Sequence, residues 1–176
     1  MKFSCLLSEI KGDLPNQSFN IKAFFINYFY SARFRVLLNH RIGKFCFQSN
    51  SFIIRQISSY YKYKLISKRG CDISYNAIIG RNLRLPHPIG IVIGDGVIIG
   101  DNVMLFQQVT LGSHGKKGDK MNYPVVENGV KIFAGAKIIG GVVIGENAVV
   151  GANAVVNINV PPDSTAVGIP AKILMK

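Results

Sequence analysis

The chain has 176 residues, of which 48% are apolar and 17% are charged, a balance that excludes a disordered chain. No apolar run reaches the roughly 18 residues that a membrane-spanning helix needs, and charged residues interrupt any signal-peptide core. Three cysteines without a CxxC pattern exclude a disulfide framework and a zinc knuckle. We therefore expect a cytoplasmic protein of one domain, with or without an appendage.

The net charge of +12 is concentrated at the N-terminal end of the chain. Residues 1–70 contain twelve of the 21 Lys and Arg residues but only two of the nine acidic residues. The remainder is close to neutral and carries no motif of a nucleic-acid-binding fold. Nucleic acid is therefore not an expected partner.

Residues 1–70 are predicted to form a short α-helical segment. A helix capped by Asn16, Ser18 or Asn20 and running to about Phe47 gathers aromatic residues on one face. The opposite side carries Lys22, Arg33, Arg41 and Lys44, and a second basic, aromatic stretch follows at residues 60–69. We expect the aromatic face to pack on the domain and the charges to face solvent. The alternative is a basic surface in peripheral contact with anionic lipid at the inner face of the plasma membrane.

From Ile73 onward the sequence repeats every six residues. Branched aliphatic residues recur in step, and a small or β-branched residue stands four places after most of them. The aliphatic positions are Ile73, Ile79, Leu85, Ile93, Ile99, Leu105, Leu111, Val126, Ile132, Ile138, Ile144, Val150 and Val156. A period of six fits a solenoid of triangular coils, each side of which supplies one inward aliphatic. We predict a mainly β fold, a parallel β-helix over residues 71–176, with excursions at 85–90 and 112–124.

The solenoid sequence resembles the hexapeptide-repeat acyltransferases, and within them the serine acetyltransferase branch. The motifs that carry the resemblance lie at residues 72–74, 80–81, 86–94, 107–112 and 168–172. It implies a left-handed parallel β-helix, a homotrimer and acetyl-CoA in a groove between neighbouring copies. The short helical leader is closest in character to the capsule and exopolysaccharide O-acetyltransferases of this family.

The resemblance implies that His87 and Asp72 are the catalytic pair. An acceptor hydroxyl needs a general base to attack a thioester, and the ordinary pKa of imidazole lies near neutrality. A carboxylate on the far ring nitrogen would fix the tautomer and stabilise the imidazolium. The alternatives are a loop histidine held between two prolines and, for Asp72, an Asx turn that opens the first coil.

The family's cofactor groove maps onto five further residues and requires no metal. By family position, Ala134 and Ala152 would line the path of the pantetheine arm, and the Ser113 backbone would lie close to the thioester. Lys116 and Lys172 could neutralise phosphates of CoA. His114, in the same loop as Lys116, could contact the acceptor or a phosphate, or could be a solvated loop residue.

The acceptor site departs from the serine acetyltransferase pattern. Those enzymes have an Asp before the catalytic His and an Arg-His pair before the proline that closes the loop, where this chain has Pro86, Asn122 and Tyr123. Pro and Asn cannot hold the ammonium and carboxylate of an amino acid by charge, whereas Tyr123 could stack on a neutral ring.

We therefore expect an acetyl-CoA-dependent O-acetyltransferase that acts on a hydroxyl of a glycan acceptor, a saccharide precursor of surface polysaccharide. One alternative is a serine O-acetyltransferase of cysteine biosynthesis, with a small-molecule acceptor. Another is a non-catalytic structural trimer. A zinc-dependent β-helix hydratase is disfavoured because it needs a closely spaced histidine pair, which this chain does not have.

Overall fold

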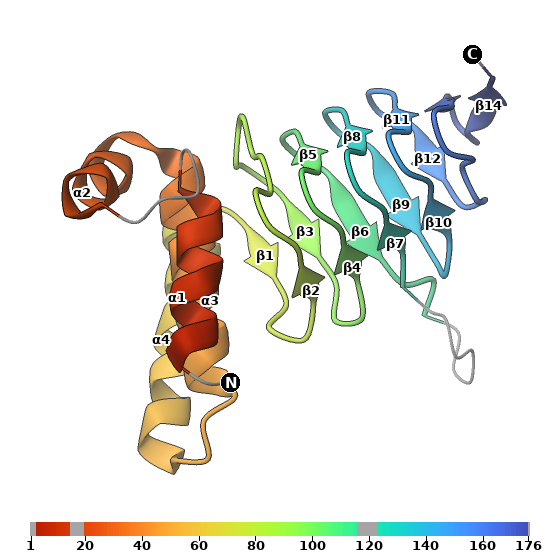
Figure 1. Cartoon of the computed structure of the whole chain (residues 1–176). Coiled ribbons are helices and arrows are strands. Elements are labelled where there is room, and N and C mark those ends of the chain that lie inside the picture. Colours follow the sequence, from red (N-terminus) through yellow and green to blue (C-terminus); the bar gives the residue numbers. More distant parts are fainter. Residues whose placement is uncertain (1–2, 15–19, 116–122, 176) are drawn as a thin grey trace.

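Four helices lie at one end of a β solenoid in the computed structural model, which describes residues 3–14, 20–115 and 123–175 (Figure 1). The helices are α1 (Phe3–Asp13), α2 (Ile21–Tyr30), α3 (Ala32–Phe47) and α4 (Phe52–Arg69). The helix predicted to end near Phe47 is broken at Ser31, whose extended backbone ends α2 and whose side chain caps α3 by accepting from the Phe34 N–H at 3.2 Å. Asn20 caps α2, whereas Asn16 and Ser18 lie outside the described residues.

The strands stack in three sheets, one on each side of the coil. Each strand within the described ranges has only two or three residues. Sheet A contains β1 (Asp72–Ile73), β3 (Val92–Ile93), β6 (Thr110–Gly112), β9 (Lys137–Ile139) and β12 (Val155–Val156). Sheet B contains β2 (Ile78–Ile79), β4 (Ile98–Ile99), β7 (Val125–Val126) and β10 (Val143–Ile144). Sheet C contains β5 (Met104–Leu105), β8 (Lys131–Ile132), β11 (Val149–Val150), β13 (Thr165–Val167) and the antiparallel β14 (Lys172–Leu174).

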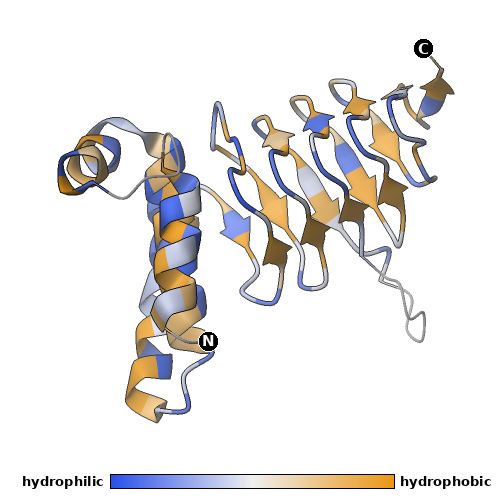
Figure 2. Cartoon of the chain, viewed as in Figure 1, coloured by the Kyte–Doolittle hydropathy of each residue, from blue (hydrophilic) through white to orange (hydrophobic). Residues whose placement is uncertain are grey.

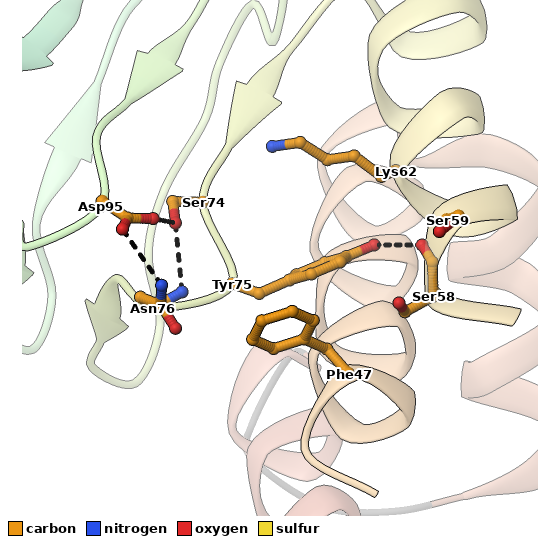
Figure 3. A pocket seen from close by; sticks show the side chains of 8 residues that line it. All are labelled: Phe47, Ser58, Ser59, Lys62, Ser74, Tyr75, Asn76 and Asp95. Atoms are coloured by element: carbon orange, nitrogen blue, oxygen red, sulfur yellow. Dashed lines mark hydrogen bonds between the residues drawn. The ribbon is translucent and has the colours of Figure 1, made fainter. Parts of the chain in front are cut away.

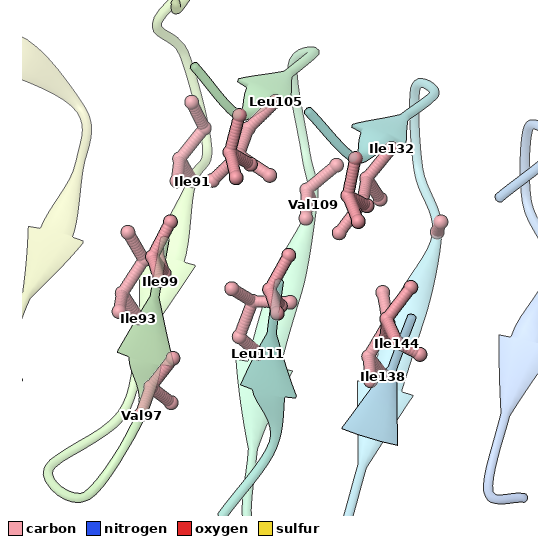
Figure 4. Packing of buried hydrophobic residues seen from close by; sticks show 14 of the residues in the cluster. Ile91, Ile93, Val97, Ile99, Leu105, Val109, Leu111, Ile132, Ile138 and Ile144 are labelled. Atoms are coloured by element: carbon pink, nitrogen blue, oxygen red, sulfur yellow. The ribbon is translucent and has the colours of Figure 1, made fainter. Parts of the chain in front are cut away.

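The predicted aliphatic repeat forms the core of the solenoid. All of the in-step aliphatic side chains from Ile73 to Val156 are at most 6% exposed. Equivalent residues of successive coils lie above one another, as Ile93, Leu111 and Ile138 do through the pairing of β3, β6 and β9 (Figure 4). The outward position beside each aliphatic is exposed or half-buried, so burial alternates along the strands. Many outward residues are apolar as well, and most strands are therefore orange in Figure 2.

Basic side chains of the helices cover the open edge of the first coil, which corrects the expectation that they face solvent or lipid. The Arg41 guanidinium, 1% exposed, donates to the carbonyls of Ile79 and Gly80, both at 3.0 Å. Lys44 donates to the Ala77 carbonyl at 2.7 Å, and Arg33 donates to a further carbonyl of the same coil. An uncovered edge strand would leave such carbonyls without hydrogen-bond donors. These cations therefore cap the first coil of the solenoid.

The helices also form a small core of their own, and their outer aromatic residues remain exposed. Leu6, Phe34 and Leu38 are buried together, and Phe24 packs against them. Phe25 and Phe29, which were expected on the packed face, are 54% and 64% exposed. No helix within the described ranges is long and apolar enough to cross a membrane. The alternative of a basic, lipid-facing surface is not supported, because Arg33, Arg41 and Lys44 donate hydrogen bonds to carbonyls of the first coil.

Candidate active site

Two edges of sheet A carry the residues that the sequence singled out. We call the turn that leads from sheet C into sheet A the C–A corner, and the turn that leads from sheet A into sheet B the A–B corner. The C–A corners of successive coils are joined by backbone hydrogen bonds, for example from the Gln108 N–H to the Ile89 carbonyl and from the Asn153 N–H to the Ala134 carbonyl, both 2.9 Å. The C–A corners of successive coils therefore form a continuous ridge along the solenoid.

His87 lies exposed at the first C–A corner, at the head of a row of aromatic side chains. Its imidazole centroid is 6.5 Å from the ring of Phe106 in the next coil. Phe106 in turn stacks on Phe133 one coil further, with the centroids 4.9 Å apart and the ring planes 14° from parallel. Next to the histidine, this corner thus offers two stacked aromatic rings, which we call the aromatic ledge.

The aromatic ledge was missed in the sequence, although the repeat contains a signal for it. The position after an in-step aliphatic is glycine at six places, namely Gly80, Gly94, Gly100, Gly112, Gly145 and Gly151. Phe106 and Phe133 follow Leu105 and Ile132 in this position. Two aromatic residues in a position that most often holds glycine, on consecutive coils beside the same histidine, indicate a surface built for a ligand rather than for the core.

The residues assigned to the pantetheine groove follow the same ridge. Ala134, half-buried, comes directly after Phe133, and Ala152, exposed, lies at the C–A corner of the following coil. Lys172 is exposed at the start of β14, at the far end of the solenoid from the helices. The described ridge therefore runs from His87 past the aromatic ledge and two alanines, with a basic residue at the last coil.

Asp72 lies on the exposed side of β1, where its carboxylate accepts a hydrogen bond from the Lys62 ammonium of α4. Lys62 also donates to the Ile73 carbonyl at 3.0 Å. Among the described residues, no hydrogen bond joins Asp72 to His87. The expected pairing with His87 stays a prediction.

Two acceptor-side candidates, Tyr123 and His114, lie at the A–B corners. The ring of Tyr123 lies against Gly94 and Gly96, where a methyl group on Gly96 would come within 2.5 Å of the ring. His114 lies against Gly140, and the Ser113 hydroxyl accepts from a backbone N–H two residues on at 3.0 Å. Pro86 is exposed beside His87. Lys116 and Asn122 lie outside the described residues.

His87 therefore lies on the opposite edge of sheet A from His114 and Tyr123. A strand of sheet A and its flanking residues separate the C–A corner at Gln108 from the A–B corner at Ser113, roughly 16 Å at about 3.3 Å per residue. Side chains on the two edges of one copy cannot share a small acceptor. The C–A corner of one copy and the A–B corner of another can.

A hollow of about 390 Å³ lies between α4 and the first A–B corners (Figure 3). Its charged groups already have partners, since Lys62 bonds to Asp72, and Asp95 accepts hydrogen bonds from Ser74 and Asn76. These two bonds hold the pKa of Asp95 below its ordinary value. In the described part of the chain, no group of three His, Cys, Asp or Glu residues is arranged to hold a metal ion.

The chain is similar to known transferases in sequence and in structure. Residues 123–157 match the family "Bacterial transferase hexapeptide (six repeats)". The serine acetyltransferase of Buchnera aphidicola subsp. Acyrthosiphon pisum is 39% identical over 145 residues, which cover 82% of this chain and 52% of that protein. Soybean serine acetyltransferase complexed with serine is 30% identical, with a TM-score of 0.78 over 97% of this chain and 68% of that one. A serine acetyltransferase complexed with CoA is 30% identical, with a TM-score of 0.77 over 97% of this chain and 68% of that one.

The coiled sheets and the matched repeat define a left-handed β-helix of the hexapeptide-repeat class, which confirms the fold class expected from the sequence. The chain belongs to the serine acetyltransferase family, because it is 30% identical to the soybean protein and covers more than two thirds of it. It spans about half the length of the curated relatives it matches. These relatives do not support the expected character of a capsule or exopolysaccharide O-acetyltransferase.

Proposed function

We propose that the chain is an acetyl-CoA-dependent O-acetyltransferase whose acceptor is the hydroxyl of L-serine. The observation that carries the proposal is the position of His87, exposed at the head of a ridge that continues through the aromatic ledge to Ala134 and Ala152. The relatives support the acceptor and the donor, since one was solved with serine and another with CoA.

In the proposed reaction, His87 acts as general base. The imidazole takes the proton of the acceptor hydroxyl while the hydroxyl oxygen attacks the carbonyl carbon of the thioester. The tetrahedral intermediate then expels the CoA thiolate, which receives the proton from the imidazolium. Asp72 would fix the ring orientation through the far nitrogen. The acetyl group thus moves from sulfur to oxygen, and no oxidant or metal takes part.

The position of the candidates on opposite edges of sheet A supports a site shared between copies. In a closed threefold ring, the C–A corner of one copy can face the A–B corner of the next. His87 would then come from one copy, and His114 and Tyr123 from its neighbour. The homotrimer is part of the proposal for this reason.

A saccharide hydroxyl is the second candidate acceptor. The observation that favours it is Pro86, an exposed neutral residue directly before His87. An amino acid's ammonium gains from a carboxylate at this position, whereas a sugar hydroxyl does not require one.

The two acceptors are distinguished by the release of CoA from acetyl-CoA. L-serine as the sole acceptor is compared with a panel of free and nucleotide-linked sugars, and the product is weighed by mass spectrometry. The proposal expects O-acetylserine. Release with a saccharide but not with L-serine would show that the acceptor is a saccharide and that the reaction is still O-acetyl transfer. No release with any acceptor, together with no CoA-induced thermal shift, would favour a non-catalytic trimer.

A further inference from the structure

A hollow of about 350 Å³ opens directly beside His87, on the side that faces the helices. Its floor is the C–A corner at residues 86–89, and its walls come from the start of α3 and the end of α4. The hollow belongs to one copy of the chain, and His87 is part of its lining. A molecule seated there would lie against the imidazole.

The charged residues that line this hollow are all basic. They are Arg35 of α3 and Lys68 and Arg69 of α4, and no acidic residue lines it. Among the described residues, ion pairs involve only the cations Arg41 and Lys62, so none of the three has a carboxylate partner. The hollow therefore holds uncompensated positive charge.

One of these cations is held in place by hydrogen bonds, and another carries a buried donor without a partner among the described residues. The Arg35 guanidinium donates to the last carbonyls of α2, to Tyr28 at 3.1 Å and to Phe29 at 2.6 Å, and this fixes its position without neutralising its charge. The Nε–H of Arg69 is buried and has no hydrogen-bond partner within the described residues. A buried donor without a partner is costly, and an anion is the partner that a guanidinium binds best.

We propose that this hollow binds an anionic group of the acceptor and thereby places the acceptor hydroxyl against His87. The inference rests on the proposed function and names the recognition element of its acceptor. The anion is the carboxylate of an amino acid or the phosphate of a nucleotide-linked sugar, and both are ligands for the same guanidinium and ammonium groups. Arg69 and Lys68 would supply the positive charge for the acceptor's anion, which Asn122 in the loop before Pro124 cannot supply.

Binding is tested without turnover, on the full chain containing carbon-13-labelled histidine. Inorganic phosphate and L-serine are titrated in turn, and the His87 resonance is assigned as the one that is missing in His87→Ala. We expect a saturable shift of the His87 signal, with a dissociation constant about tenfold larger in Arg69→Met and also raised in Lys68→Ala. Arg55→Met is the matched control, because it makes the same substitution near the other end of α4, outside the hollow, and should leave binding unchanged. The absence of a shift, or equal binding by Arg69→Met, would overturn the anion site.

Turnover identifies the source of the anion. L-serine is compared with L-serinamide, and N-acetylglucosamine 1-phosphate with N-acetylglucosamine, so the two members of each pair differ in the anionic group. The proposal expects the anionic member of the active pair to have the higher kcat/KM by about tenfold, and expects Arg69→Met to remove this preference while the KM for acetyl-CoA stays unchanged. Equal use of the neutral member would overturn it. Saturable phosphate binding without acetyl transfer to any acceptor would instead overturn the proposed function and leave the anion site standing.

Discussion

The Lys62 ammonium on α4 donates a hydrogen bond to the Asp72 carboxylate on β1, so the helical segment contacts the carboxylate that is proposed to orient His87. The pair is partly exposed, with 32% of the Lys62 side chain and 51% of the Asp72 side chain accessible. Exposed ion pairs contribute about 1 kcal/mol or less to stability. The effect of Asp72 should therefore appear in turnover rather than in folding.

Asp72→Asn should lower kcat by about tenfold or more while the melting temperature changes little, because an amide cannot stabilise the imidazolium by charge. The measurement is steady-state CoA release beside thermal unfolding. Lys62→Met is the control, since it removes the ion pair but keeps the carboxylate, and it should retain most of the turnover. An equal loss in both variants would show that the ion pair, and not the carboxylate, is what matters.

Phe133→Gly should raise the KM for acetyl-CoA by about five- to tenfold and leave the KM for the acceptor unchanged, because it removes half of the aromatic ledge. Glycine is the residue that the repeat itself carries in this position at Gly151, so the backbone accommodates it. Initial rates at varied acetyl-CoA measure the effect. Asn157→Gly, the same position after Val156 but at an A–B corner, is the control. A rise in the KM of the acceptor alone would place the ledge in the acceptor site.

His40 should make the fold sensitive to acid. It is fully buried among Arg41, Lys44 and Lys62, and burial first, then these cations, lower its pKa well below 6.5. The unfolded chain binds the proton near pH 6.5 and the folded chain does not, so stability is present above that pH and is lost as the pH falls below it.

The comparison for this prediction is His40→Phe, which keeps the ring beside Tyr75, 5.7 Å away in the native protein, and removes the titration. Denaturant unfolding between pH 8 and pH 5 should show the free energy of the native protein falling more steeply than that of the variant. Parallel curves would mean that His40 takes up a proton in the folded chain. Asp95, whose pKa is lowered, contributes only at lower pH, near and below its ordinary value of 3.8.

The solenoid was predictable because each coil repeats one simple requirement. An aliphatic residue every six positions, such as Ile93, Leu111 and Ile138, buries itself only if the coils stack in register. The helical segment was harder to interpret. An amphipathic pattern separates apolar from charged residues but does not say what the charged side meets, and here Arg41 and Lys44 meet the carbonyls of the first coil.

The candidate site was predictable in part. His87 and Asp72 were found through a motif, and Ala134 and Ala152 through their family positions. The basic hollow was not predicted, because Arg35 and Arg69 are 34 residues apart in the sequence and meet only where α3 and α4 both pack beside the first C–A corner. Tertiary packing, and no local pattern, brings these charges to His87.

His87 is the proposed general base for acetyl transfer to an acceptor hydroxyl, and the most direct test of this role is the rate of CoA release with L-serine for the native chain and for His87→Ala. The account predicts turnover by the native chain and a loss of about 10²- to 10⁴-fold in the variant, with CoA affinity and oligomeric state unchanged. Turnover by His87→Ala at the native rate would contradict it.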